Sequence, residues 1–104
     1  MTSETLAGVA VELNDEGFLV DPHQWNEEIA VALAAREGIE LSERHWEVVR
    51  FMRAEFERRG EGPNVRLLGK TSGVSVKELY GLFPKGPAKL AAKIAGIPKP
   101  RGCI

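Results

Sequence analysis

The sequence contains a single cysteine, two histidines and no long apolar run. One cysteine cannot form a disulfide within the chain, so no internal crosslink stabilises the fold. One cysteine and two well-separated histidines also fall short of a structural metal site, and we expect neither a metal nor another cofactor. No stretch approaches the roughly 18–20 consecutive apolar residues that a membrane-spanning helix needs. These absences argue against disulfide-rich, zinc-dependent and membrane-spanning proteins.

The composition is that of a folded protein with one core. The chain has 104 residues, of which 43% are apolar and 28% are charged. This balance is too apolar for a disordered chain, and the length allows a modest buried core. The N-terminal residues, MTSETLAG, have neither the basic region nor the apolar run of a signal peptide. We therefore expect a cytoplasmic protein.

The net charge of -1 hides an uneven distribution along the chain. Residues 1–47 carry eleven acidic residues and two arginines, whereas residues 48–104 carry twelve lysines or arginines and four glutamates. From Lys85 onward there are five positive charges and no acid. A positive segment of this kind is typically solvated, binds nucleic acid or attracts an anionic group. The only thiol of the chain, Cys103, lies in this segment.

The pattern of apolar residues predicts a β-hairpin followed by helices. Residues 9–13 alternate in polarity and precede turn-forming residues at 14–17, so we expect them to pair with residues 18–20. Apolar periodicity, caps and helix-stop residues predict helices over 23–36, 43–59, 63–70, 75–83 and 88–95. The fold class is therefore mainly α (α+β), a small helical bundle with a helix-turn-helix-like arrangement, an N-terminal β-hairpin and an extended C-terminal arm.

The last eight residues differ from the rest of the chain. Pro98 and Pro100 prevent helix formation, so we expect a domain over residues 1–96 and an extended, flexible arm over residues 97–104. Prolines restrict the conformations of such an arm, and projecting a thiol away from the domain then costs less entropy. Cys103 lies one residue before the last and is the candidate reactive group.

The chemical state of Cys103 depends on opposing charges. Lys93, Lys99 and Arg101 favour the thiolate, which is the nucleophilic form. A terminal carboxylate acts the other way, and the sequence leaves the balance open. Most lone cysteines are buried as small apolar residues. A penultimate position on a proline-containing arm is seldom buried, however, which favours an accessible thiol.

The spacing of three predicted helices also fits a DNA-binding helix-turn-helix. Residues 43–59, 63–70 and 75–83 follow one another with a short glycine-containing turn before the last helix. That last helix, SVKELYGLF, has one basic residue and no Arg, Asn or Gln that could read base edges. A DNA-binding regulator therefore stays an alternative. His23 and His45 lie at helix starts beside tryptophans, where capping or packing is the expected role.

Several segments carry a family resemblance. They are LFPKGPAK at 82–89, KIAGIPKP at 93–100, GCI at 102–104, NDEGFL at 14–19, LSERHWEVVRF at 41–51 and VRLL at 65–68. Together they closely resemble the DsrC/TusE family over nearly the whole chain, and the C-terminal run is highly specific. The resemblance implies a small, mainly helical fold with an N-terminal hairpin and a mobile C-terminal arm.

The resemblance also implies a sulfur relay. Cys103 would accept sulfane sulfur as a persulfide from a donor, a TusBCD/DsrEFH-like complex, and pass it to an acceptor. In the TusE branch the sulfur moves toward a thiouridylase that modifies tRNA. In the DsrC branch it moves through dissimilatory sulfur metabolism.

The chain departs from the two-cysteine members of this family. Ala92 occupies the place of their upstream cysteine, so a trisulfide or disulfide within the arm is impossible, which argues against a full dissimilatory role. Residues 68–75 are also shorter than the corresponding loop in other members, in a region that can affect partner choice.

The remaining residues of the predicted site surround Cys103 in sequence. We expect Lys99 and Arg101 to stabilise negative charge and to steer docking onto an acidic partner. Pro98, Pro100 and Gly102 shape the arm. Arg66 and Lys85 are candidates for the surface against which the unloaded arm rests.

Overall fold

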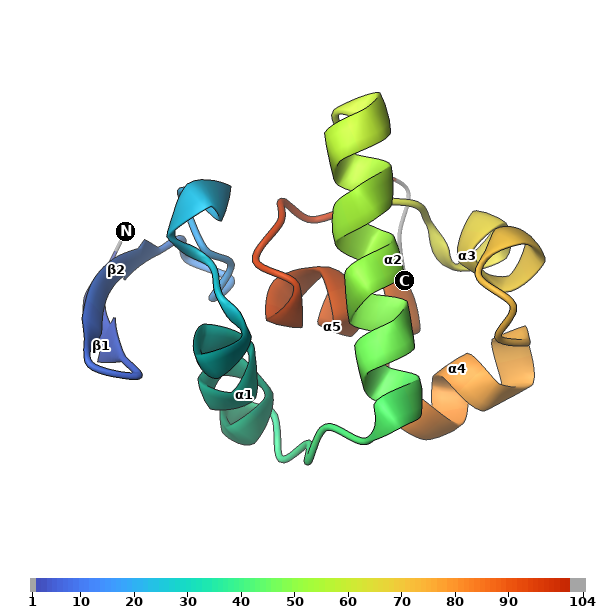
Figure 1. Cartoon of the computed structure of the whole chain (residues 1–104), viewed down its shortest axis with the longest axis horizontal. Coiled ribbons are helices and arrows are strands. Elements are labelled where there is room, and N and C mark those ends of the chain that lie inside the picture. The colour runs from blue at the N-terminus through green and yellow to red at the C-terminus, as the bar shows by residue number, and fades with distance from the viewer. Residues whose placement is uncertain (1, 102–104) are drawn as a thin grey trace.

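The computed structural model describes residues 2–101, which form a small hairpin and a helical body (Figure 1). The elements are β1 (Thr2–Leu6), β2 (Val9–Leu13), the 3-10 helix η1 (Pro22–Gln24), α1 (Glu27–Arg36), α2 (Glu43–Arg59), α3 (Val65–Thr71), α4 (Val76–Leu82) and α5 (Pro87–Ile94). The long helix α2 lies across the middle of the molecule, with α1 on one side and α3 and α4 on the other (Figure 1). The predicted fold class, including the N-terminal hairpin, is confirmed.

The strands of the hairpin differ from the predicted pair. β1 and β2 are antiparallel, with Leu6 opposite Val9. Ala7 and Gly8 connect them with φ values of 51° and 79°, as a two-residue hairpin turn requires. The predicted pairing of 9–13 with 18–20 was wrong in extent, because it is reduced to a single bridge between Leu13 and Leu19.

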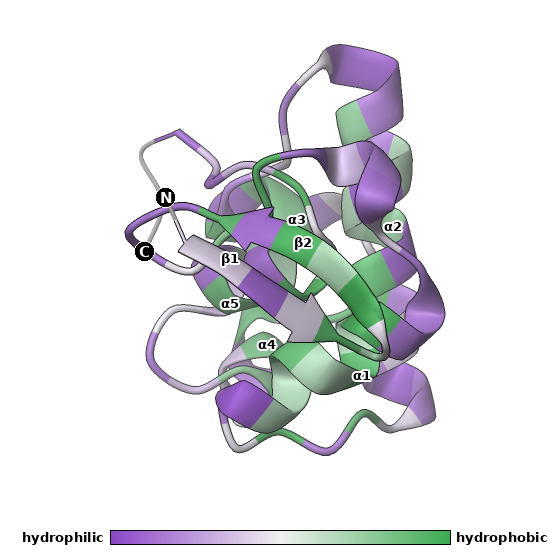
Figure 2. Cartoon of the chain, turned by 90° about the vertical axis from the view of Figure 1, so that its left-hand side faces the viewer, coloured by the Kyte–Doolittle hydropathy of each residue, from purple (hydrophilic) through white to green (hydrophobic). Residues whose placement is uncertain are grey.

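Asn14 explains why the chain turns away instead of forming a second long hairpin. Its side-chain oxygen accepts hydrogen bonds from the backbone N–H groups of Glu16 and Phe18, both at 3.0 Å. This compact loop directs Phe18 and Leu19 into the interior, where both are buried. Seen from the hairpin side, β1 is mainly polar and β2 carries more hydrophobic residues (Figure 2).

Side-chain caps determine where the helices begin. Ser42 and His45 form a reciprocal capping box at the start of α2, and Gly60, with φ of 80°, ends that helix as predicted. α1 begins at Glu27 rather than at 23, because Asn26 caps it after the short 3-10 turn. Similarly, Asn64 caps α3, which therefore begins at 65 rather than 63. Asparagine side chains in this role satisfy otherwise unpaired N–H groups.

The main core lies where α2 and α5 meet, and α1, α3 and α4 also contribute buried residues to it. α5 contributes small residues, and Ala88, Ala91 and Ala92 are fully buried. Phe18 and Phe83 fill the same core from the loop before η1 and from the end of α4. The core also contains Ile97, so the first residue of the predicted arm packs with the helical body.

Two features are absent from residues 2–101, a helix able to span a membrane and a cluster of metal-binding side chains. None of its helices combines the length and apolar character that crossing a membrane requires. Among these same residues, no group of three or more His, Cys, Asp or Glu side chains is placed to hold a metal ion.

Candidate functional site at the C-terminal segment

The end of α5 fixes the start of the segment that leads to Cys103. The N–H groups of Gly96 and Ile97 donate to the carbonyl oxygens of Lys93 and Ala92, at 3.2 and 3.1 Å, which is a Schellman motif. Gly96 has φ of 70°, and a Cβ atom there would lie 2.4 Å from Cδ1 of Trp25. Glycine therefore satisfies both the backbone conformation and the close packing at this position.

Two side chains from distant elements hold the last carbonyl groups of α5. Nε1 of Trp25 donates to the oxygen of Ile94 at 2.9 Å, and Nη1 of Arg53 donates to the oxygen of Ala95 at 2.8 Å. The guanidinium carbon of Arg53 lies 4.3 Å from the Trp25 ring centroid, a cation–π contact. Burial lowers the pKa of Arg53, but an arginine stays protonated at neutral pH. The charge therefore stabilises the negative end of the α5 dipole.

Beyond Gly96, apolar contacts hold the segment against the loop between α2 and α3. Ile97 is fully buried and Pro100 is buried, whereas Pro98 and Lys99 are exposed. A Cβ atom at Gly62 would lie 2.8 Å from Cδ1 of Ile97 and 3.6 Å from Cγ of Pro100. Ile97 and Pro100 thus face the body, and the two residues between them face solvent.

Exposed ion pairs complete the contacts of this segment. Nζ of Lys99 lies 3.2 Å from a carboxylate oxygen of Glu16, and Nζ of Lys89 lies 3.4 Å from the same oxygen. The hydrogen bond from Lys99, and secondly that from Lys89, lowers the pKa of the Glu16 carboxyl. Arg101 lies 3.6 Å from Glu61, and its side chain is 91% exposed. Such surface pairs are weak, so a partner can exchange them at little cost.

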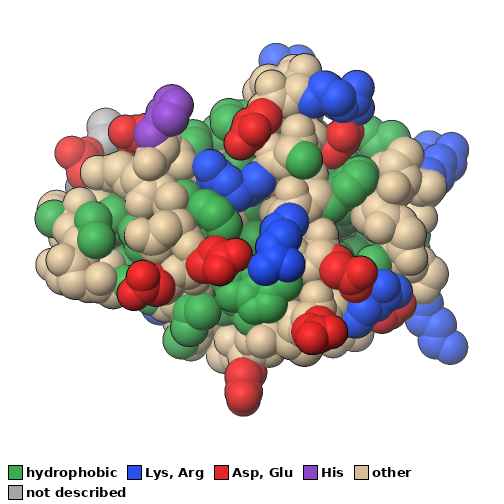
Figure 3. All heavy atoms as spheres, in the orientation of Figure 1, with side chains coloured by type: hydrophobic (Ala, Val, Ile, Leu, Met, Phe, Trp, Pro, Cys, Tyr) green, Lys and Arg blue, Asp and Glu red, His purple; other side chains and the backbone are tan. Residues whose placement is uncertain are grey.

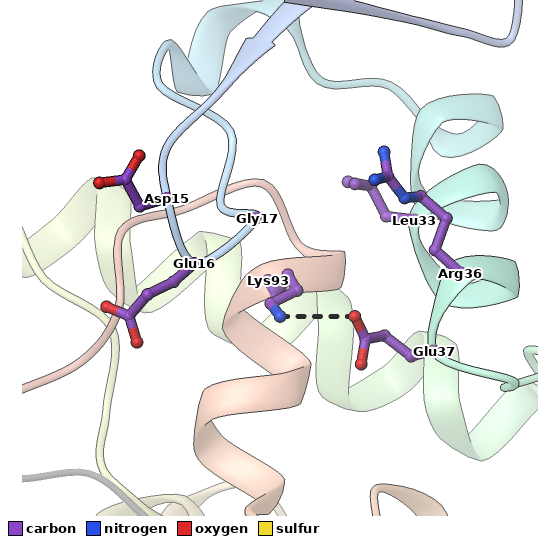
Figure 4. Close-up of a pocket in the computed structure, with 7 residues that line it drawn as sticks. All are labelled: Asp15, Glu16, Gly17, Leu33, Arg36, Glu37 and Lys93. Atoms are coloured by element: carbon purple, nitrogen blue, oxygen red, sulfur yellow. Dashed lines mark hydrogen bonds and ion pairs between the residues drawn. The ribbon is translucent and has the colours of Figure 1, made fainter. Parts of the chain in front are cut away.

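Lys93, the third residue predicted to stabilise the thiolate, is on α5 and pairs with a different glutamate. Its Nζ is 3.4 Å from a carboxylate oxygen of Glu37 and 5.3 Å from the Phe18 ring centroid, and only 14% of its side chain is exposed. Figure 4 shows it between the loop at Gly17 and the end of α1. Its ammonium group joins α5 to α1 and to the loop after β2.

Arg66 and Lys85, the candidate arm-docking residues, are both exposed. Arg66 is in the first turn of α3, and Lys85 lies in the turn after α4 with φ of 69°. The side chains found against residues 94–101 belong instead to Trp25 and Arg53 and to the glutamates at 16 and 61. A resting place for the arm on Arg66 and Lys85 stays a prediction. Gly102 and Cys103 lie outside the described residues.

Sequence reasoning missed the residues that hold this segment. Nothing in the sequence indicates that Trp25, Arg53 or Glu16 contacts the C-terminal segment. The bonds from Trp25 and Arg53 span 69 and 42 positions of the chain, so no local pattern signals them. The close approach of Gly62 and Gly96 to their neighbours is likewise visible only in the folded chain.

The family model described as "DsrC like protein" matches residues 5–104, a range that includes Cys103. The chain belongs to this family. Sulfurtransferase TusE of Salmonella typhimurium is 49% identical, and that of Escherichia coli is 47% identical; each alignment covers 93% of this chain and 95% of the relative. The crystal structure of oxidized DsrC, the gamma-subunit of the dissimilatory sulfite reductase from Archaeoglobus fulgidus, superposes with a TM-score of 0.85 at 39% identity. It covers 99% of this chain and 100% of that one.

Membership of the DsrC-like family confirms the predicted family and supports a carrier role in a sulfur relay. None of these three relatives is named as a DNA-binding regulator, so nothing favours that alternative. Within this DsrC-like chain, the Schellman motif and the bonds from Trp25 and Arg53 hold the start of the C-terminal segment, and Ile97 and Pro100 pack against the body. The exposed ion pairs of this segment add only weak contacts.

Proposed function

We propose that this DsrC-like protein is a sulfur carrier that accepts sulfane sulfur on Cys103 and passes it to an acceptor protein. The observation that carries the proposal is that the family match extends through Cys103, the only cysteine in the chain. A relay based on one thiol per carrier needs no second cysteine and no metal. A cytoplasmic setting, in which single thiols stay reduced, suits this chemistry.

The proposed reaction is an exchange between sulfur atoms. The Cys103 thiolate attacks the outer sulfur of a donor persulfide, R–S–SH, and forms the bond of Cys103–S–SH. The S–S bond of the donor breaks, and the donor leaves as the thiolate R–S⁻. An acceptor thiolate then attacks the outer sulfur on Cys103 in the same way, so no external oxidant or reductant is consumed. The rates depend on thiolate character and access, as in thiol–disulfide exchange.

The surroundings of the segment support this chemistry in two ways. Lys99 and Arg101, close to Cys103 in sequence, favour the thiolate and complement a negatively charged partner. Their ion pairs with Glu16 and Glu61 are surface pairs that a competing acidic surface can replace. Gly96 and the buried Ile97 and Pro100 then keep the described part of the segment in place when those ion pairs are exchanged.

We assign the relay to the TusE type, in which a donor complex resembling TusBCD loads the carrier and a tRNA thiouridylase accepts the sulfur. Two observations support this choice over dissimilatory metabolism. Identity to the TusE relatives is 47–49%, against 39% for the DsrC structure. In addition, Ala92 replaces the second cysteine that an internal trisulfide requires.

The test compares the wild-type protein with Cys103→Ser. Each is incubated with a persulfidated donor complex, separated under non-reducing conditions and weighed by mass spectrometry. The wild type is expected to gain the mass of one sulfur atom, which dithiothreitol then removes, whereas Cys103→Ser gains nothing. Retention of the added sulfur by Cys103→Ser would refute the carrier assignment.

A further inference from the structure

The lysines and arginines of the described residues divide into those that have an ion-pair or hydrogen-bond partner and those that have none. Most are bonded to carboxylates, namely Arg36, Arg44, Arg50, Arg58, Arg59, Lys89, Lys93, Lys99 and Arg101. Arg53 instead donates to backbone carbonyl groups. Within residues 2–101, the cations with no such partner follow one another along the chain: Arg66, Lys70, Lys77 and Lys85. All four are exposed.

These unpaired cations belong to one structural unit. Arg66 and Lys70 lie one turn apart on α3, Lys77 is in the first turn of α4, and Lys85 follows α4. The two helices are tightly joined, because a Cβ atom at Gly69 would lie 2.4 Å from Cγ2 of Val76. The only acid between 63 and 86, Glu78, is bonded to Arg44. Figure 3 shows blue side chains projecting at the edge of the molecule over α3 and α4.

The same unit also exposes apolar surface. Val76 and Tyr80, one turn apart on α4, are 42% and 43% exposed. Protein interfaces commonly have an apolar centre, enriched in tyrosine, inside a polar rim. We define the α3–α4 face as Arg66, Lys70, Lys77 and Lys85 together with Val76 and Tyr80.

The loop that leads into α3 contacts the segment that leads to Cys103. Gly62, in the loop between α2 and α3, packs against Ile97 and Pro100. A protein seated on α3 and α4 is therefore beside the start of the arm, and an arm that leaves this point can reach into that protein.

We propose that the α3–α4 face docks an acidic surface of the sulfur donor protein, an inference that rests on the proposed function. Unpaired cations complement carboxylates. Val76 and Tyr80 supply an apolar centre that another protein can bury but that a phosphate backbone, which is charged, does not complement. An acceptor that binds tRNA needs cations around its own site, and those repel this face. The donor is thus the relay member that fits both the charge and the apolar centre.

The experiment measures binding to a purified TusBCD/DsrEFH-like donor complex by calorimetry at several salt concentrations. Every protein carries Cys103→Ser, so that binding is separated from transfer. Lys70→Gln/Lys77→Gln is expected to weaken binding about tenfold at low salt and to flatten its salt dependence. Tyr80→Ala is expected to weaken it at least about tenfold at every salt concentration. The control, Arg36→Gln/Arg50→Gln, removes the same charge elsewhere and should retain wild-type affinity.

Two results would overturn the docking surface. One is unchanged affinity in both α3–α4 variants while circular dichroism shows the native fold. The other is an equal loss in Arg36→Gln/Arg50→Gln, which would assign the effect to net charge. A gel shift with tRNA tests the other class of partner. If Lys70→Gln/Lys77→Gln abolishes RNA binding and leaves donor binding intact, the face binds nucleic acid instead.

Failure of this inference is distinguishable from failure of the proposed function. Wild-type protein is also treated with inorganic polysulfide, which loads an accessible thiol without a docking partner. A wild type that gains no sulfur from either polysulfide or the donor contradicts the carrier function itself. A wild type that gains sulfur, with donor binding unaffected by the α3–α4 variants, contradicts the docking surface alone.

Discussion

At the scale of single residues, glycine and charge determine how the C-terminal segment begins. Gly96 combines a left-handed backbone conformation with close packing against Trp25. The Glu16 carboxylate forms ion pairs with both Lys89 and Lys99. The first feature is rigid because it involves backbone and a large ring. The second is adjustable because all three side chains reach solvent.

Replacing Gly96 is expected to destabilise the protein strongly. In Gly96→Ala, a left-handed alanine costs about 1–2 kcal/mol, and overpacking against Trp25 adds about 1–3 kcal/mol. Gly60→Ala is the matched control, since Gly60 has φ of 80° but no atom within 4 Å of the added Cβ. Urea unfolding should therefore show a smaller loss for Gly60→Ala; equal losses would mean that the contact with Trp25 is unimportant.

The pKa of Glu16 should report the contact with Lys99. Because this pKa is lowered below its ordinary value of 4.5 in the folded protein, the ion pair is complete above that pH and is lost as the pH falls through the lowered pKa. Lys99→Gln should raise the pKa of Glu16 more than Lys89→Gln does, since Lys99 makes the larger contribution. Carbon-detected NMR titration of the side-chain carboxyl measures both, and no change in Lys99→Gln would show that the contact is absent in solution.

At the scale of elements, α5 depends on donors that come from outside its own sequence. Trp25 follows η1 and Arg53 lies on α2, yet both bond to carbonyl groups at the end of α5. These bonds connect three elements at the point where the C-terminal segment begins. They keep that point fixed relative to the core.

Trp25→Phe tests this connection while keeping most of the packing. Loss of the bond to Ile94 leaves a carbonyl group without its donor, and we expect the free energy of unfolding to fall by about 1–2 kcal/mol. Amide hydrogen exchange at residues 95–97 should accelerate together with this loss. Trp46→Phe is the control on α2, and it should leave exchange at 95–97 unchanged; equal acceleration in both variants would contradict a specific role for Trp25.

The same scale shows what could be predicted from the sequence. α2 was predicted in full because its signals are local: Ser42 caps it and Gly60 ends it. β1 was missed because TSETL has no apolar alternation and forms a strand only by pairing with β2. The donors from Trp25 and Arg53 depend on the tertiary fold, and periodicity contains no information about them. The assignment of Cys103 as the reactive group, by contrast, rests on its position and its flanking motif alone and stays a prediction.

At the scale of the whole molecule, acids of the N-terminal half pair with cations of the C-terminal half, as Glu16 does with Lys99 and Glu37 with Lys93. Of the five positive charges from Lys85 onward, those of Lys89, Lys93, Lys99 and Arg101 each have a glutamate partner within residues 2–101. The unpaired positive charge lies on α3, α4 and the turn that follows. The unpaired cations are therefore distinct from the paired cations of the segment that leads to Cys103.

A single thiol also limits how the molecule responds to oxidation. Mild oxidation by diamide should produce a disulfide-linked dimer through Cys103, and dithiothreitol should return it to the monomer. Cys103→Ser should stay monomeric under both conditions. Non-reducing electrophoresis with intact-mass measurement checks this outcome, and an oxidised monomer with an internal crosslink would contradict the proposed chemistry.

The most direct measurement of the carrier function follows one sulfur atom through the protein. Cys103 is loaded with isotopically labelled sulfur, freed of the donor, and mixed in a single turnover with an acceptor thiouridylase and its tRNA. We expect the labelled sulfur to leave the carrier as it appears in the tRNA, and we expect blocking of Cys103 with an alkylating reagent to stop the transfer. Labelled sulfur that stays on the carrier, or that reaches the tRNA equally well from a carrier alkylated before loading, would contradict the carrier function.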